Sequence, residues 1–238
     1  MLPSPTAEDS TPLRQQLEYY RARAAEYDQW WLRQGRYDRG AKLNARWFEE
    51  AAVVSSALSS FQPAGRVLEL ACGTGIWSEK LLPFASKLTA VDGSQEMLAL
   101  NEARLGSPLV RYVAADLFQW RPAEQFDVVF FSFWLSHVPP EYFAAFWQLV
   151  QSCLAPGGRV FLVDSRHEQT STAADHRLPH PEATVLHRRL NDGREFQIYK
   201  VFYHPAELAE RLRQLGWHFD IHQTDHYYIY GSGHRLKA

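Results

Sequence analysis

The sequence predicts an α/β fold with a mostly parallel β-sheet, and three observations lead to this fold class. Short apolar segments alternate with helical patterns of about 10 to 15 residues between residues 66 and 164, which is typical of βαβ units. The apolar segments lack polar alternation, as expected for strands covered by helices on both faces. The 238 residues, 46% of them hydrophobic, are enough for one large domain with a buried core.

Two helices are predicted ahead of the first strand. Apolar side chains recur at spacings of four and three between Leu13 and Trp31, so they share one stripe of a helix of about 20 residues. A second stripe runs from Leu43 to Leu58 and predicts a helix that ends near Ser60. The first ten residues are polar and contain proline, and we expect them to form a loose tail.

Five strands follow in order, each with a helix or a turn behind it. The predicted strands cover residues 66–72, 88–92, 109–113, 127–135 and 160–164. The predicted helices are one of about ten residues after Gly75, one from Ser94 to Leu105 and one from Glu141 to Leu154.

The pattern changes after Asp164. Residues 165–182 are polar and without periodicity, and residues 184–190 and 195–203 flank the hairpin turn Asn191-Asp-Gly-Arg194. A helix is predicted from Pro205 to Gly216, and a single last strand over residues 217–230.

A glycine loop and two acids follow three successive strands. Gly73 and Gly75 lie between a buried strand and a helix start, where the backbone can pass close to a ligand. Asp92 ends the next strand, in place to accept hydrogen bonds from both hydroxyls of a ribose. Asp116 follows the third strand, where its carboxylate can accept from an adenine amino group beside the Leu117 backbone. Together these residues predict an adenosine site at the carboxyl ends of the strands.

The glycine loop is not built for phosphates. Ser78 occupies the third glycine position of a dinucleotide site, behind the bulky Ile76-Trp77, and no Lys-Ser/Thr pair follows the glycines. A ligand with an adenosine end and a zwitterionic amino-acid end fits the loop better.

The motifs in this order resemble the class I S-adenosylmethionine-dependent methyltransferases of the small-molecule type. The matching segments are Glu69-x-Ala71-x-Gly73-x-Gly75, Asp92, Asp116-Leu117, Phe131 to Pro139 and Leu154 to Gly158. The resemblance implies a Rossmann-like, seven-stranded, mostly parallel sheet with an antiparallel last strand. It also implies an N-terminal tail and helical lid over residues 1–60, and a methyltransferase domain over residues 61–238 with an inserted loop and hairpin at about 165–203.

The resemblance and the residue types together suggest three groups of site residues. Those expected to bind S-adenosylmethionine are Tyr27, Trp31, Glu69, Ala71, Gly73, Gly75, Asp92, Gly93, Met97, Asp116, Leu117 and Phe133. Those expected to contact substrate are Tyr20, Trp134, Arg166 and Tyr199, with Arg188 and Arg189 of the hairpin as further candidates. His137 is the candidate general base, with an imidazole pKa near the working pH. The alternative is that the aromatic stripe only packs on the core and that His137 is a loop residue.

The expected reaction is in-line transfer of a methyl group to oxygen, or to nitrogen or sulfur, of a small, aromatic or carboxylated acceptor. Two other functions stay open: a non-catalytic S-adenosylmethionine-binding regulator, and an NAD-dependent oxidoreductase. The acceptor, the methylated atom and the choice between monomer and homodimer also stay open.

Composition limits the partners and the compartment. The 25 Lys and Arg nearly balance the 27 Asp and Glu without a basic block, which argues against nucleic acid. The apolar run 128–135 is too short to cross a membrane, and no secretion signal is recognisable. Cys72 and Cys153 fit a reducing, cytoplasmic compartment. No metal is expected, although His218, His222 and His226 recur every four residues.

Overall fold

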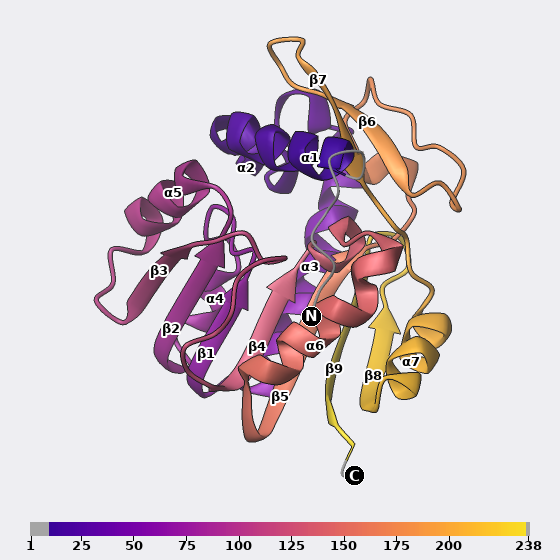
Figure 1. Ribbon diagram of the computed structural model, residues 1–238. Helices are drawn as coiled ribbons and strands as arrows, with labels where there is room; N and C mark the ends of the chain where they lie inside the picture. The colour runs from indigo at the N-terminus through magenta and orange to yellow at the C-terminus, as the bar shows by residue number, and fades with distance from the viewer. Residues whose placement is uncertain (1–9, 237–238) are drawn as a thin grey trace.

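The computed structural model describes residues 10–236, so most of the predicted tail lies outside the described residues. Its centre is a seven-stranded sheet in the order β3-β2-β1-β4-β5-β9-β8 (Figure 1). The strands are β1 (Gly65–Leu70), β2 (Ala85–Asp92), β3 (Val110–Ala114), β4 (Phe126–Ser132), β5 (Leu154–Ser165), β8 (Trp217–Gln223) and β9 (Tyr228–Arg235). Only the last strand, β9, runs antiparallel to its two neighbours, β5 and β8. The predicted fold class is confirmed.

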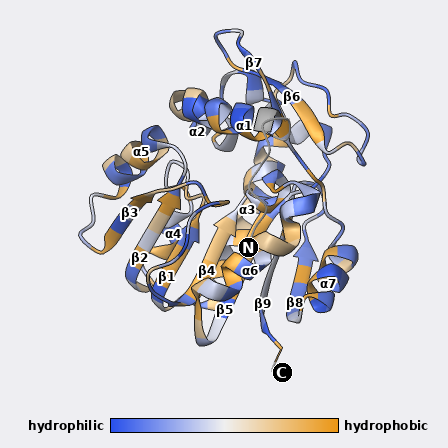
Figure 2. Ribbon diagram, in the orientation of Figure 1, coloured by the Kyte–Doolittle hydropathy of each residue, from blue (hydrophilic) through white to orange (hydrophobic). Residues whose placement is uncertain are grey.

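Helices cover both faces of the sheet and create two cores. On one face, α6 (Phe143–Cys153) and α7 (Pro205–Gln214) pack on side chains such as Val129 and Phe131 of β4. On the other, α3 (Ala41–Phe61) and α4 (Ser78–Leu81) pack on Val128 and Phe130 of the same strand, and α5 (Gln95–Leu105) packs on β2. Figure 2 shows the central strands as mainly hydrophobic. Successive residues of β4 enter opposite cores, which explains why the strand shows no polar alternation.

The predicted 20-residue N-terminal helix is wrong, because a tight turn divides it. The segment consists of α1 (Ser10–Arg23), the 3₁₀ turn Ala24–Glu26 and α2 (Tyr27–Trp31). A 3₁₀ turn has three residues per turn instead of 3.6, so the side chains after it face a new direction. Trp30 and Trp31 therefore reach Trp47 of α3, with ring centroids 5.2 and 6.0 Å apart.

Two further predictions were wrong in length. The helix after the glycine loop, α4, has four residues rather than about ten, because Pro83 restricts the chain at Leu82. The predicted strand 217–230 is two strands, β8 and β9, joined by a turn. Glu50 holds that turn, because its carboxylate accepts hydrogen bonds from the backbone N–H of His226 at 3.1 Å and of Tyr227 at 2.9 Å.

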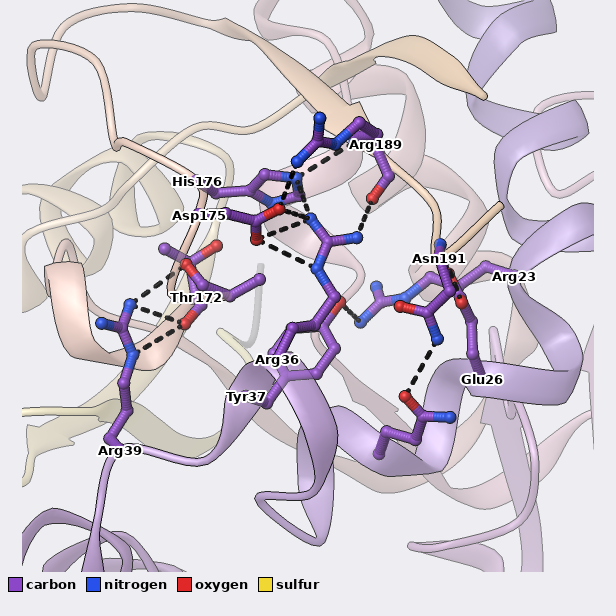
Figure 3. A network of polar contacts seen from close by, with 12 residues as sticks. Arg23, Glu26, Arg36, Tyr37, Arg39, Thr172, Asp175, His176, Arg189 and Asn191 are labelled. Carbon is purple, nitrogen blue, oxygen red and sulfur yellow. Dashed lines mark hydrogen bonds and ion pairs between the residues drawn. The ribbon is translucent and has the colours of Figure 1, made fainter. Parts of the chain in front are cut away.

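The N-terminal segment and the inserted hairpin form a cap over the carboxyl ends of the strands (Figure 1). We define the cap as residues 10–40 and 166–204; its hairpin is β6 (Val185–Arg189) and β7 (Glu195–Tyr199), as predicted. Figure 3 shows how the two halves join: Arg36 and Arg189 both donate to the carboxylate of Asp175, at 2.7 and 2.6 Å. Among the described residues, no helix is long and apolar enough to cross a membrane.

Candidate functional site

A cavity of about 750 Å³ lies under the cap, at the ends of β1, β2, β3 and β4. We call it the large cavity; its volume is in the range of small-ligand sites. Its lining includes twelve of the predicted site residues: Tyr20, Tyr27, Ala71, Gly73, Asp92, Gly93, Met97, Asp116, Leu117, Phe133, Trp134 and His137. The structure thus brings together residues from the N-terminal helices and from the ends of four strands.

The two loop glycines have different roles. Both have positive φ, +53° at Gly73 and +90° at Gly75. A Cβ added at Gly73 would meet no protein atom within 4 Å and would occupy cavity space, whereas a Cβ at Gly75 would lie 2.7 Å from Oδ1 of Asn101. Gly73 therefore leaves room for a ligand, and Gly75, which does not line the large cavity, leaves room for the protein itself.

Two carboxylates are fixed by backbone N–H groups on the cavity wall. Asp92 accepts from Gly73 at 2.9 Å through one oxygen and from Ser94 at 2.8 Å through the other, and Asp116 accepts from Phe118 at 3.0 Å. Burial raises the pKa of Asp92, and the hydrogen bonds from Ser94 and Gly73 oppose this shift. Each oxygen keeps lone-pair directions for hydroxyl or amino donors of a ligand.

Besides Gly75, four predicted site residues lie behind or beside the large cavity rather than on its wall. Glu69 is buried and accepts a hydrogen bond from the Ser78 hydroxyl, and burial raises its pKa to about 8. Trp31 lines only a space of about 20 Å³ near Gly73 and packs on Trp77. Arg166 donates to the carbonyls of Thr224 and Asp225 at the β8–β9 turn. Tyr199 contributes its backbone, as described next. These positions argue for structural roles.

His137 lies beneath the cap, and both of its ring nitrogens have hydrogen-bond partners. Its Nδ1 lies 2.6 Å from the carbonyl of Tyr199, and its Nε2 lies 2.7 Å from the hydroxyl of Tyr20. Because a carbonyl only accepts, Nδ1 carries the proton and Nε2 accepts from Tyr20. Burial, followed by the charge of Lys200, holds the pKa of His137 well below its usual range. The expectation of a pKa near the working pH is therefore wrong, and the imidazole is neutral.

A second cavity of about 60 Å³ adjoins the large one. We call it the small cavity. Both cavities are lined by Tyr20, Tyr27, Phe133 and His137, which form a shared wall. Phe133 has φ +52°, an uncommon conformation for a bulky residue and one that clusters at functional sites.

The cap is latched to the glycine loop by Asp28 of α2. One carboxylate oxygen accepts from the Thr74 hydroxyl at 2.6 Å, and the other pairs with Arg104 of α5. Asp28 thereby ties α2 of the cap to the loop that carries Gly73.

The histidines of the last sheet hairpin do not form a metal site. His218 and His222 lie on β8, but His226 lies in the following turn and contacts Glu50 at 3.2 Å. Over residues 10–236, no group of three possible ligands is close enough to hold a metal ion.

Comparison with known proteins gives a consistent result. Residues 67–158 match a family model described as a methyltransferase domain. The solved structure of DhpI in complex with SAH is similar over 98% of this chain and 100% of its own, with a TM-score of 0.78 and 37% identity. The chain belongs to the class I S-adenosylmethionine-dependent methyltransferases.

Curated relatives of this methyltransferase family support the assignment. The ubiquinone biosynthesis O-methyltransferase of Xylella fastidiosa (strain M23) is 33% identical over 178 residues, which are 73% of this chain and 69% of the relative. That of Xanthomonas axonopodis pv. citri (strain 306) is 32% identical over 65% of this chain, which spans 64% of the relative, under two thirds of its length. DhpI has also been solved as a SAM-HEP complex, 38% identical over 97% of this chain with a TM-score of 0.78.

S-adenosylmethionine fits the residues of the large cavity. Gly73 presents a space without a side chain, Asp92 would accept hydrogen bonds from ribose hydroxyls, and Asp116 beside Leu117 would accept one from an adenine amino group. This match to the methyltransferase family argues against the oxidoreductase alternative.

Some lining residues were not predicted. Leu13, Gln16 and Leu17 of α1, and Phe118, Gln119 and Arg121 after β3, also line the large cavity. The spacing of Leu13 and Leu17 on the apolar stripe was a usable signal, but it indicated packing on the core.

We predict that substitution of Gly73 mainly weakens ligand binding, whereas substitution of Gly75 mainly lowers the stability of the protein. Gly73→Ala should lower the affinity for S-adenosylhomocysteine at least about tenfold, because the alanine side chain occupies ligand space. The positive φ at this position should also lower the free energy of unfolding by about 1 kcal/mol. Gly75→Ala should lower the unfolding temperature more, because its Cβ overlaps Asn101. Calorimetric titration and thermal unfolding of both variants test this. Wild-type affinity in Gly73→Ala would show that no ligand approaches the loop.

We also predict that Glu69 makes the free protein less stable as pH rises. Its pKa of about 8 in the folded state lies above the ordinary glutamate value of 4.5. The stability that the raised pKa contributes is therefore fully present below pH 4.5 and is lost as pH rises toward 8. Glu69→Gln should therefore reduce the loss of unfolding free energy between pH 5 and pH 8, measured by denaturant titration without ligand. Glu79→Gln, an exchange at an exposed glutamate of α4, is the control. Equal pH slopes in wild type and Glu69→Gln would contradict the raised pKa.

Proposed function

We propose that this protein transfers the methyl group of S-adenosylmethionine to an oxygen of a small organic acceptor, with nitrogen or sulfur as alternative acceptor atoms. The observation that carries the proposal is the shared wall of Tyr20, Tyr27, Phe133 and His137. It places a small second cavity next to a cavity that fits the cofactor. The relatives named O-methyltransferases support oxygen as the acceptor atom.

The reaction depends more on alignment of the acceptor with the methyl carbon than on acid–base catalysis. When bound, S-adenosylmethionine supplies a sulfonium methyl group; the acceptor forms a new bond to this carbon as the carbon–sulfur bond breaks, and a neutral thioether leaves. The contribution of the protein is to hold the acceptor in line, about 3 to 3.5 Å from the methyl carbon, and to exclude water. The cap does both, since Asp28 latches it over the glycine loop and Arg36 joins its two halves.

His137 acts through Tyr20 in this proposal. Burial raises the pKa of Tyr20 well above its usual range, so the phenol stays protonated and donates to Nε2 of His137. The neutral imidazole thereby fixes the phenol ring at the shared wall. A proton released by a hydroxyl acceptor reaches His137 only if Tyr20 passes it on or moves aside. We therefore assign His137 a positioning role.

The acceptor is a small molecule in this proposal, since the space on its side of the shared wall is about 60 Å³. This volume does not accommodate a nucleotide base, so we do not propose nucleic acid as a substrate. A monomer and a homodimer are both compatible with the proposal.

The proposed function is tested by binding and by turnover. In calorimetric titrations, S-adenosylmethionine and S-adenosylhomocysteine should bind wild type at micromolar concentration, NAD should not, and Asp92→Ala should lose about 100-fold in affinity with its two ribose hydrogen bonds. With a panel of small acceptors, mass spectrometry should find one acceptor that gains a methyl group in parallel with release of S-adenosylhomocysteine. Cofactor binding without transfer to any acceptor would favour the non-catalytic regulator instead.

We predict that Tyr20 and His137 act as one unit. With the acceptor found in this screen, Tyr20→Phe and His137→Ala should each lower kcat/KM roughly 10- to 100-fold. The kcat/KM of the double variant should be about equal to that of the less active single variant. His187→Ala, which removes an exposed histidine of β6, is the control. Additive losses in the double variant would show that the two side chains act independently.

A further inference from the structure

The side chain of Gln16 lies on the wall of the large cavity, but both of its polar atoms bind the protein backbone. The residue belongs to α1 and is only 3% exposed. Its Nε2 donates to the carbonyl of His137 at 3.1 Å, and its Oε1 accepts from the backbone N–H of Tyr199 at 3.0 Å. A buried amide that pairs with two backbone groups from distant segments fixes the relative position of those segments.

The two residues that Gln16 holds are also joined to each other. Nδ1 of His137 donates to the carbonyl of Tyr199 at 2.6 Å, so the residue that gives its N–H to Gln16 accepts from the imidazole. The backbone carbonyl of His137 accepts from Gln16 in turn. Gln16 therefore fixes both sides of this contact: the backbone that carries the imidazole, and the residue whose carbonyl accepts from it.

The double contact needs an amide side chain at position 16. The carbonyl of His137 can only accept and the N–H of Tyr199 can only donate, so the side chain between them needs one donor and one acceptor. An ionised glutamate has no donor. A methionine, which is similar in length, has no N–H or O–H group and only a weak acceptor. Exchanges to these two residues therefore remove different parts of the contact at nearly constant size.

The adjacent residue, Gln15, provides a comparison for simple docking of the hairpin. Its Oε1 accepts from the backbone N–H of Gln197 at 2.8 Å. Gln197 and Tyr199 are two positions apart in β7, so their N–H groups lie on the same edge of the strand, which faces α1. Gln15 and Gln16 thus tie the same edge to the same helix, and Gln16 makes a second bond, to His137.

The effect of Gln16 reaches the shared wall through the tautomer of His137. With Nδ1 protonated and bound to Tyr199, Nε2 has a lone pair that accepts from the Tyr20 hydroxyl at 2.7 Å. If the backbone of Tyr199 shifts, the imidazole loses the acceptor that selects this tautomer. A proton on Nε2 would reverse the bond to Tyr20, so that the phenol oxygen accepts and its own hydrogen points elsewhere.

We propose that Gln16 is a positioning residue for methyl transfer: its amide holds Tyr199 against Nδ1 of His137, so that Nε2 remains an acceptor and fixes Tyr20 at the shared wall. The inference rests on the proposed function for the methyl transfer, whereas the effect on the tautomer stands on the hydrogen bonds alone. Leu17 of α1 also lines the large cavity. A cofactor bound there would therefore contact the helix that positions His137.

The first test measures the tautomer of His137 in the free protein, without turnover. Long-range ¹H–¹⁵N spectra distinguish a protonated ring nitrogen from an unprotonated one, and a His137→Gln variant identifies the signals among the 10 histidines. We expect a proton on Nδ1 alone in wild type and in Gln15→Met, and signals averaged between the two nitrogens in Gln16→Met. Protonation of Nε2 in wild type, or of Nδ1 alone in a folded Gln16→Met, overturns the proposal.

The second test uses Gln16→Glu, in which the donor at position 16 depends on pH. As a neutral carboxylic acid the new side chain can donate to the carbonyl of His137, and as an anion it can only accept. Burial and the facing carbonyl favour the neutral acid. The cations that line the small cavity behind the shared wall, Arg23, Arg188 and Lys200, oppose this preference. Lowering the pH therefore restores the donor without a change in the sequence.

With the acceptor found in the mass-spectrometric screen, Gln16→Glu should lose about tenfold in kcat relative to wild type at pH 8.5 and recover at pH 6, with the KM for S-adenosylmethionine within about twofold. An equal loss at both pH values, or a similar loss in Gln15→Met, overturns the proposal. If no acceptor is methylated, the tautomer is measured in Gln16→Glu instead. A proton on Nδ1 alone at pH 6, but not at pH 8.5, then supports the role of Gln16, and only the proposed function fails.

Discussion

The side chain of Gln16 connects the three parts of the molecule that meet at the shared wall. From helix α1 its Nε2 donates to the carbonyl of His137 at 3.1 Å, and its Oε1 accepts from the N–H of Tyr199 at 3.0 Å. The residue is only 3% exposed, so neither bond competes with water. This one amide ties the helix to the end of β4 and to the hairpin edge. Both cavities depend on this arrangement, because the cap supplies their roof and the strand ends supply their floor.

The floor was largely predictable from the sequence, since it depends on local patterns. Strand ends can be located from apolar runs, and parallel strands bring their carboxyl ends together, so the sequence alone places Gly73, Asp92 and Asp116 at one edge of the sheet, where the structure has them. Glu69 and Gly75 share the same motif, yet they support the loop from behind. A motif gives positions along the chain, and it does not distinguish a side chain that faces the ligand from one that packs beneath it.

The roof was less predictable. Arg188 was a candidate because it lies on the inserted hairpin, but Arg23 and Lys200 carry no local pattern that indicates a common cavity. They meet only because α1 lies against β7, where Gln15 and Gln16 accept hydrogen bonds from the backbone N–H groups of Gln197 and Tyr199. The division of the N-terminal helix was missed for a similar reason, because packing of Trp30 and Trp31 on α3 outweighs the continuous helical stripe.

The cap joins segments that are far apart in the chain, and this affects how the protein forms during synthesis. Gln16 and Tyr199 are separated by 183 positions. At about 5 to 20 residues per second, a ribosome adds that length in roughly 10 to 40 s. Over this interval Gln16 has no hairpin to pair with, and the apolar face of α1 lacks its final partner. The parallel strands can assemble in the meantime, so the floor of the site is expected to exist before its roof.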